Sequence, residues 1–181
     1  MSEDGFGFTL RFSRRYSMAH RLISGVAPNC RVPHGHDEVV TVDIVENSNA
    51  GLDEKTNMLV EFEQVKGRWF KWIDKAVDHS FHLGDGDPLV AYFRENEPDM
   101  LPRLLITPGD PTTEIRAACF ARKLRAFLDA DNPGFACHRL TIQETPTNAV
   151  EFRPWGANAV LPQGDHWWTR PDQSINDLAA A

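Results

Sequence analysis

The chain has 181 residues, of which 41% are hydrophobic and 25% are charged, so it can bury an ordinary core within one domain. This composition excludes collagen-like, coiled-coil and wholly disordered proteins. A net charge of -7 argues against binding to nucleic acid, and no stretch is apolar for long enough to span a bilayer. Because the chain starts with acidic residues rather than a basic and apolar signal sequence, we expect a cytoplasmic protein.

Hydrophobic periodicity predicts two strands and a helix in the first half of the chain. Apolar and polar residues alternate over residues 8–19, which predicts a strand. A second strand is predicted to begin near His36 and to continue through β-branched residues towards Asn47. From Phe62 the apolar residues recur at helical spacing, which predicts an amphipathic helix that ends near Val77.

The second half predicts another helix and two more strands. Residues 83–110 carry Gly, Asp and Pro at both ends and are interpreted as a connecting excursion that contains a short helix. Asp110 is predicted to cap the next helix, with Pro111 at its first position. Strands are then expected at residues 139–142 and 149–152. The resulting order, ββααββ, indicates an α+β fold.

The domain organisation is expected to be simple. Residues 1–152 are predicted to form one domain, and residues 153–181 a C-terminal extension without regular periodicity. The extension contains Trp155, Trp167 and Trp168. Three exposed tryptophans would form an aggregation-prone patch, so the extension is predicted to pack against a subunit.

Three histidines gather within residues 20–36. His34 and His36 have the i, i+2 spacing that points both imidazoles to one side of an extended backbone, and His20 could supply a third nitrogen from the preceding strand. Three imidazoles around Zn²⁺ leave a fourth position open for water or substrate, which is typical of catalytic zinc sites. The alternative is a loop of unrelated polar residues.

The three cysteines are an odd number at unrelated spacings, which argues against a disulfide framework. Cys30 lies close to the histidines in the sequence. It would either complete a structural site as a fourth ligand or act beside the open position as a reactive thiolate. Cys119 and Cys137 have no polar cluster near them and are predicted to be small buried residues.

Two further groups of polar residues are candidates for chemistry. Asp78 could orient His79 and favour its protonated form, which would give a proton-transfer pair, although an ordinary surface pair is an equal alternative. Glu144 is predicted to face inward with the apolar side of its strand, where a carboxylate needs a partner. That partner is either a ligand with two parallel N–H donors or a structural salt bridge. His138 and His166 are expected to be exposed.

Six short motifs follow one another along residues 8–152. They are Tyr16-Ser-Met-Ala-His20-Arg21, Cys30-x-x-x-His34-Gly35-His36, Val60-Glu61-Phe62 with Lys66, Asp78-His79, Pro111-Thr112-Thr113-Glu114, and Glu144-Thr145. In this combination and order the chain resembles the 6-pyruvoyltetrahydropterin synthase and 6-carboxytetrahydropterin synthase family. The resemblance implies a tunnelling fold (T-fold) in which ββααββ forms a four-stranded antiparallel sheet with two helices on one face.

The resemblance also implies a cofactor, a substrate and a role for each site residue. The cofactor would be Zn²⁺ and the substrate a reduced pterin. The implied residues are His20, His34 and His36 for the metal, Cys30, Asp78 and His79 for catalysis, and Glu144, Thr112 and Thr113 for substrate binding. Family members form trimers that stack into hexamers, so the resemblance implies a homo-oligomer whose active sites lie between subunits.

The implied activity depends on the branch of the family. The 6-carboxy branch consists of zinc-dependent lyases that convert 7,8-dihydroneopterin triphosphate to 6-carboxy-5,6,7,8-tetrahydropterin, acetaldehyde and triphosphate in queuosine biosynthesis. The three-residue gap between Cys30 and His34 resembles this branch. The alternative is 6-pyruvoyltetrahydropterin synthase, which eliminates triphosphate only.

Some residues depart from the family pattern. Glu61 stands where Asp is usual, and Asp37 and Glu38 stand where a small polar residue and an aromatic are usual. Two acids near a triphosphate would be unfavourable, which leaves a pterin without phosphate as an alternative substrate. An alternative of another class is a non-catalytic zinc module in which Cys30 completes the metal site and another surface binds a protein.

Overall fold

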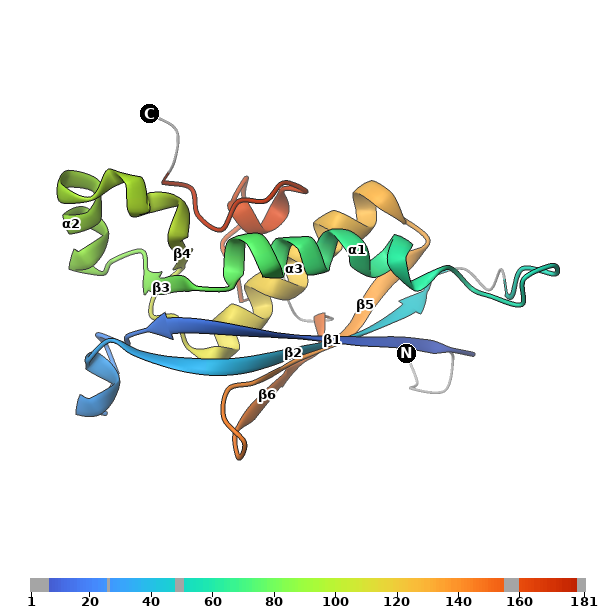
Figure 1. Cartoon of the computed structure of the whole chain (residues 1–181), viewed down its shortest axis with the longest axis horizontal. Coiled ribbons are helices and arrows are strands. Elements are labelled where there is room, and N and C mark those ends of the chain that lie inside the picture. Colours follow the sequence, from blue (N-terminus) through green and yellow to red (C-terminus); the bar gives the residue numbers. More distant parts are fainter. Residues whose placement is uncertain (1–6, 26, 48–50, 155–159, 179–181) are drawn as a thin grey trace.

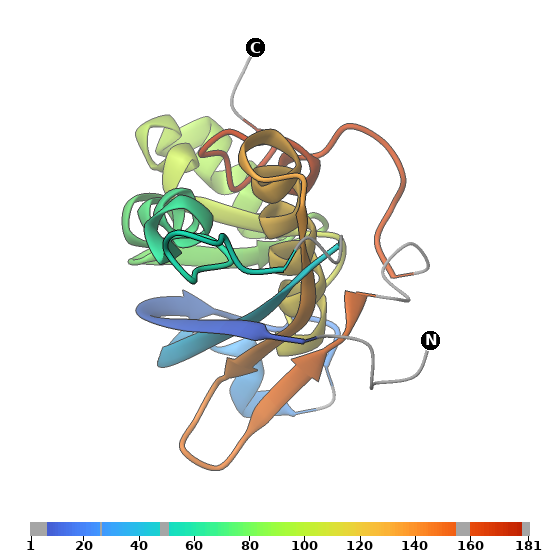
Figure 2. The ribbon, with the colours of Figure 1, turned by 90° about the vertical axis from the view of Figure 1, so that its right-hand side faces the viewer.

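In the computed structural model a curled sheet carries two long helices on one face (Figure 1, Figure 2). The structure describes residues 7–25, 27–47, 51–154 and 160–178. The strands are β1 (Thr9–His20), β2 (His34–Glu46), β3 (Ser80–Gly84), β4 (Leu104–Thr107), β5 (Phe135–Gln143) and β6 (Ala149–Phe152). The helices are α1 (Phe62–Trp72), α2 (Pro88–Asn96) and α3 (Thr113–Asp131), with short helical turns η1 (Pro28–Arg31), η2 (Ile73–Val77), η3 (Pro98–Arg103) and η5 (Trp167–Thr169).

The α+β class is confirmed, but the four-stranded antiparallel sheet is wrong. The sheet has six strands in the order β4-β3-β1-β2-β5-β6, and β3 runs parallel to both β1 and β4. Of the two additional strands, β3 begins just before the predicted excursion over residues 83–110, and β4 lies near its end. β4 is only four residues long and buried throughout, so it lacks the alternation that identifies a half-exposed strand.

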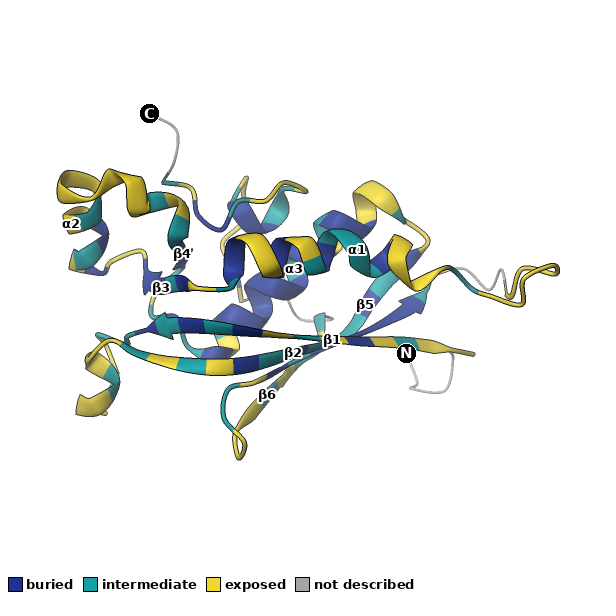
Figure 3. Cartoon of the chain, viewed as in Figure 1, coloured by how far each residue is buried: buried dark blue, intermediate teal, exposed yellow. Residues whose placement is uncertain are grey.

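The long strands β1 and β2 follow the predicted alternation. In β1, Phe12, Tyr16 and Met18 face the helices and are buried, whereas the odd-numbered residues between them are exposed or half-buried. Figure 3 shows this alternation as changing colours along the ribbon of β1. The same even-numbered side of β2 carries Val40, Val42 and Ile44 into the core. This two-residue period sends His20, His34 and His36 to the helix-covered face.

Helix α3 crosses the sheet with a buried stripe on one side. The predicted stripe is confirmed: Ala117, Phe120, Ala121, Leu124 and Leu128 are all buried. The prediction that Asp110 caps this helix is wrong.

The N-cap of α3 is Thr112, whose hydroxyl accepts a hydrogen bond from Ile115 N at 3.4 Å. The Asp110 carboxylate instead accepts hydrogen bonds from Ile23 N at 3.1 Å and Ser24 N at 2.7 Å. Asp110 therefore anchors the segment that follows β1 rather than the start of α3.

The described part of the C-terminal segment packs across the helices on the side away from the sheet (Figure 1). Trp167 and Trp168 are 1% and 4% exposed, which confirms the predicted packing for these two tryptophans. Trp155 lies outside the described residues. Trp167 Nε1 donates to Ile106 O at 2.7 Å. Residues 160–178 thus share one hydrophobic core with α1 and α3.

On the other face of the sheet, the Asp43 carboxylate lies between two arginines of neighbouring strands. It accepts hydrogen bonds from Arg11 Nε at 2.6 Å and Arg139 Nε at 2.7 Å. Burial alone would raise the pKa of Asp43, but these two arginines outweigh it and hold the pKa below 3.8. The ionised carboxylate therefore stabilises the folded chain.

Asp43→Asn is expected to lower the free energy of unfolding by about 1–3 kcal/mol at pH 7, because charge-assisted hydrogen bonds are lost. Since the folded-state pKa is the lower one, the stabilisation is present above the unfolded pKa and disappears as the pH falls through the folded pKa. In urea denaturation, the difference in free energy of unfolding between the wild type and Asp43→Asn should therefore be smaller at pH 3 than at pH 7. Asp129→Asn, which removes an exposed carboxylate from an i, i+4 pair, is the control. An effect of Asp43→Asn on the free energy of unfolding that is equal at both pH values would contradict the prediction.

Candidate metal centre

Three histidines converge where β1 ends and β2 begins. His20 and His34 are opposite each other in the antiparallel ladder, and His36 follows on the same side of β2. One ligand nitrogen from each ring lies within 4.8 Å of the other two, and the Nε2 atoms of His20 and His34 are 3.0 Å apart. Gly35 permits this arrangement, because a Cβ at that position would stand 2.8 Å from Met18 O. The three rings could therefore hold one metal ion.

Backbone carbonyls orient two of these imidazoles. His20 Nδ1 lies 3.2 Å from Pro111 O, and His34 Nδ1 lies 2.8 Å from Val32 O. A ring that donates through Nδ1 keeps the Nε2 lone pair for a metal, which is the usual arrangement around zinc. Burial, with the nearby charge of Arg116, lowers the pKa of His20 to about 4. The neutral imidazole that a metal requires is thus the stable form of His20 at neutral pH, and the donor set fits Zn²⁺.

A cavity of about 300 Å³ opens beside His20. Its lining includes Thr112, Thr113 and Glu144, the three residues proposed from the resemblance to bind substrate. Glu144 lies just after β5 rather than within the strand, and its side chain is 23% exposed. Thr113 Oγ1 donates to Glu144 Oε1 at 2.8 Å. The structure therefore brings a carboxylate and one of the three converging histidines to the same cavity.

A buried ion pair that the sequence analysis missed adjoins this cavity. Arg116 on α3 and Glu38 on β2 are both fully buried and joined by two hydrogen bonds. From the sequence, Glu38 is expected only to be an acid near the substrate. A signal was present, because Arg116 lies next to the apolar stripe of α3, where a charged residue needs a buried partner.

Cys30 lies in η1, between the two strands that carry the histidines. Its carbonyl accepts a hydrogen bond from Leu22 N at 2.8 Å, which ties η1 to the segment after β1. Its sulfur is free and half-buried, and it is not among the ligand atoms that converge with the three histidines. Cys119 and Cys137 are buried as predicted, and burial raises the pKa of both thiols, that of Cys137 to about 12.

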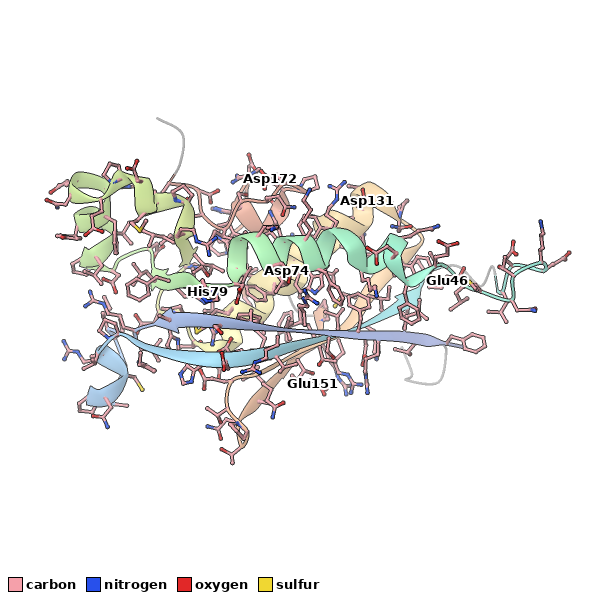
Figure 4. The ribbon with its side chains drawn as sticks, in the orientation of Figure 1. Glu46, Asp74, His79, Asp131, Glu151 and Asp172 are labelled. Atoms are coloured by element: carbon pink, nitrogen blue, oxygen red, sulfur yellow. The ribbon has the colours of Figure 1, made fainter. Side chains whose placement is uncertain are left out.

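Asp78 and His79 form a hydrogen-bonded pair just before β3. Figure 4 labels His79 near this end of the helical segment. His79 Nδ1 lies 2.7 Å from Asp78 Oδ2, and the ring is 77% exposed. Burial would raise the pKa of Asp78, but hydrogen bonds from Ser17 N and His79 outweigh it and hold the pKa below its ordinary value. Within the described residues, no hydrogen bond or ion pair joins Asp78 or His79 to the three metal-site histidines.

The remaining histidines take other positions. His82 is buried in β3, where its Nε2 lies 2.8 Å from Ser80 Oγ, and burial holds its pKa well below 6.5. His138 and His166 are half-buried, so the expectation that they are exposed is wrong. His166 stacks on Trp168 with ring centroids 4.5 Å apart. The position of His166 could not be predicted from the sequence, because residues 153–181 show no regular hydrophobic periodicity.

Fold and site together define an α+β protein with a three-histidine site for a metal ion beside a carboxylate-lined cavity. Comparison with known proteins identifies the family. Residues 9–154 match the family model described as 6-pyruvoyl tetrahydropterin synthase, and the chain belongs to this family. Across the described ranges, no helix has the length and apolar character needed to cross a membrane.

Named relatives agree with this assignment. The chain is 28% identical over 136 residues to the 6-carboxy-5,6,7,8-tetrahydropterin synthase of Rickettsia felis, covering 75% of this chain and 93% of that protein. It is 26% identical over 149 residues to the Bacillus subtilis protein of the same name, covering 82% and 87%. The 6-pyruvoyl tetrahydropterin synthase of Caenorhabditis elegans shares the fold, with a TM-score of 0.54, 23% identity and coverage of 81% and 94%.

Proposed function

We propose that the protein is a zinc-dependent lyase that converts 7,8-dihydroneopterin triphosphate and one water to 6-carboxy-5,6,7,8-tetrahydropterin, acetaldehyde and triphosphate, the reaction that supplies queuosine biosynthesis. The observation that carries the proposal is the cavity lined by His20 and Glu144, because a ligand bound there would meet both a candidate metal-binding histidine and a carboxylate. Residues 1–152 would form the synthase domain and residues 153–181 its extension, in a cytoplasmic homo-oligomer.

Each side chain has a proposed part in this reaction. Glu144 would accept the parallel N–H donors of the pterin ring, and Thr112 and Thr113 would line the same cavity. Zinc, held by His20, His34 and His36, would act as a Lewis acid towards the side-chain hydroxyls of the substrate. Cys30 would remove a carbon-bound proton as its thiolate. Its half-buried position in η1, between the strands that carry the three histidines, supports this role.

Asp78 and His79 would move protons on the opposite side of the substrate. The pair is bound to the backbone of Ser17, whose side chain lies on the face of β1 opposite to His20. An exposed pair in this position supports a site completed by a second subunit, in which Asp78 and His79 of one copy serve the cavity of another. The trimers and hexamers implied by the family resemblance would provide such contacts.

The two acids that follow His36 do not oppose a triphosphate substrate as the sequence suggested. Asp37 pairs with Arg15 and accepts from Ser17 Oγ, whereas Glu38 is buried against Arg116. Each negative charge therefore has a cationic partner within the chain, which removes the electrostatic reason to prefer a pterin without phosphate.

The reaction itself is the direct test. The zinc-loaded protein is incubated with 7,8-dihydroneopterin triphosphate, and the products are identified by mass. Acetaldehyde together with a carboxypterin is the expected result. A pyruvoyl product would favour the other branch of the family, and no consumption of substrate would count against both.

Cys30→Ala is expected to reduce turnover by at least a hundredfold, because the proposed base is lost, and to leave the zinc content near that of the wild type. A second measurement uses the burial of the other two cysteines. Iodoacetamide should modify one thiol per native chain, at Cys30, and inactivate the enzyme in step. Loss of zinc from Cys30→Ala would instead support the structural four-ligand module.

A further inference from the structure

Arg116 lies at the centre of a buried hydrogen-bond network beside the candidate metal centre. Its Nη1 and Nη2 donate to the two carboxylate oxygens of Glu38 at 2.5 and 2.8 Å. Glu38 Oε2 also accepts from the Tyr16 hydroxyl at 2.6 Å. Arg116 and Glu38 have no exposed surface, and Tyr16 is 1% exposed. Glu38 therefore neutralises the Arg116 charge entirely inside the protein.

The guanidinium also reaches the carboxylate proposed to bind the pterin. Arg116 Nη2 lies 3.1 Å from Thr113 Oγ1 and 3.5 Å from Glu144 Oε1, and Thr113 donates to the same Glu144 oxygen. One oxygen of Glu144 is thereby held from the protein side. The other, Oε2, accepts no hydrogen bond from any residue that the structure describes, and the side chain lines the cavity. The protein thus positions Oε1 of Glu144 and leaves Oε2, together with the second lone pair of Oε1, to accept the parallel donors of a ligand.

The same guanidinium contacts the carbonyl that orients a metal ligand. Arg116 Nε donates to Pro111 O at 3.2 Å, and His20 Nδ1 lies 3.2 Å from that oxygen. A group that fixes the hydrogen-bond partner of a metal-binding histidine also fixes the orientation of its ring. Arg116 is therefore linked to His20 through the shared Pro111 carbonyl, and it contacts Glu144 directly.

A contribution to the stability of the fold does not by itself explain why Arg116 and Glu38 are buried here. A buried ion pair gives little net stability compared with apolar residues of similar volume, because both charges lose their hydration. The Glu38–Arg116 pair would also be complete without the contacts to Pro111, Thr113 and Glu144. These additional contacts are the ones that connect the pair to the site.

We infer that Arg116, with Glu38 as its counter-ion, is a positioning residue that holds the ligand-binding carboxylate of Glu144 and the metal-binding ring of His20 in one fixed geometry. The inference deepens the proposed function and rests on it for the identity of the pterin ligand. Its consequence is that loss of Arg116 weakens binding of zinc and of pterin together, although Arg116 touches neither.

The test separates this role from simple support of the fold. The triple variant Tyr16→Phe/Glu38→Leu/Arg116→Met removes the fully buried ion pair together with the Tyr16 hydroxyl that binds it, and Glu144, which is 23% exposed, keeps its hydrogen bond from Thr113. The variant should therefore melt near the wild-type temperature. Affinity for Zn²⁺ is measured by competition with a chromophoric chelator, and affinity for neopterin by fluorescence on the zinc-loaded protein. We expect both affinities to fall by about 10- to 100-fold, the usual effect of removing a partner of a metal ligand.

Two further variants complete the experiment. Arg116→Lys keeps a buried charge but lacks the planar fork, so it should show the same joint loss of affinity. Arg125→Met, which removes an exposed arginine of α3, should leave both affinities unchanged. Wild-type affinities for zinc and neopterin in either folded Arg116 variant would overturn the inference. If the wild type binds zinc but no pterin, the proposed function fails, and the zinc affinities still decide the role of Arg116.

Discussion

His34→Ala is expected to abolish stoichiometric metal binding and to reduce turnover of the pterin substrate by more than about a thousandfold. Within the described residues, His20, His34 and His36 are the one set of three or more ligand residues that converge, so the loss of one ring leaves two ligands. Two remaining ligands would bind zinc too weakly to survive purification. A lost Lewis acid costs several kcal/mol of transition-state stabilisation, and each 1.4 kcal/mol is a factor of ten in rate.

The choice of His34 keeps the fold intact in this experiment. His34 is half-buried at the start of β2, whereas His20 is buried and part of the Pro111 contact. Zinc is counted by elemental analysis, and thermal unfolding is followed with and without a chelator. The chelator should lower the melting temperature of the wild type but not of His34→Ala, because a bound ion stabilises only a chain that binds it.

His79→Ala is the matched control for this prediction. It also removes an imidazole from the proposed active site, but its ring is 77% exposed and lies outside the converging set. It should therefore lose turnover while it retains one zinc ion and the response to chelator. A full zinc content in His34→Ala would show that the metal is held elsewhere.

The convergence of the three histidines could be predicted from the sequence because their placement depends on local rules. Alternation along a strand sends His34 and His36 to one face, and the antiparallel pairing of consecutive strands brings His20 opposite. The amphipathic helix after Phe62 was predictable for the same reason, since its period is visible within a few turns. These features depend only on residues that are close to one another in the sequence.

Features that depend on distant parts of the chain could not be predicted in this way. β3 and β4 pair in parallel with strands far away in the sequence, and both are too short and too buried to show alternation. Asp110 looked like a helix cap because Pro111 follows it, yet tertiary structure supplies two backbone donors from residues 23 and 24. The Glu38–Arg116 pair joins residues 78 positions apart.

The C-terminal extension has one feature that could be predicted from the sequence and one that could not. Its burial was predictable from the tryptophans, because apolar surface of that size must be covered. What holds it could not be predicted: Lys123, on the buried side of α3, donates from Nζ to Trp167 O and Arg170 O at 2.8 Å and to Asp172 Oδ1 at 3.0 Å. Figure 4 labels Asp172 on the helix side away from the sheet. A lysine beside an apolar stripe indicates a buried acceptor set but does not identify it.

Lys123→Met is expected to lower the free energy of unfolding by about 2–4 kcal/mol, because three charge-assisted hydrogen bonds are lost and the carbonyls of Trp167 and Arg170 lose their donor. Burial lowers the pKa of Lys123 to about 8, and Asp172 opposes this shift, so the ammonium form still predominates at neutral pH. Methionine is similar in length to lysine but uncharged, so it also removes the cation–π contacts of Nζ with the rings of Phe127 and Trp167, at 5.4 and 6.0 Å. The loss is therefore one of the contacts of the ammonium group rather than of volume.

The same substitution is expected to loosen residues 160–178 before the rest of the chain unfolds, because Lys123 joins the carbonyls of Trp167 and Arg170 to α3. Hydrogen exchange at the backbone amides of this segment should accelerate more than exchange in β1 and β2, and tryptophan emission should shift to the red as Trp167 meets water. Lys71→Met, at an exposed lysine of α1, should change stability by less than about 0.5 kcal/mol. Uniform acceleration of exchange over the whole chain would show that the segment unfolds only with the core, because Trp167 and Ile175 alone would then be sufficient to keep it in place.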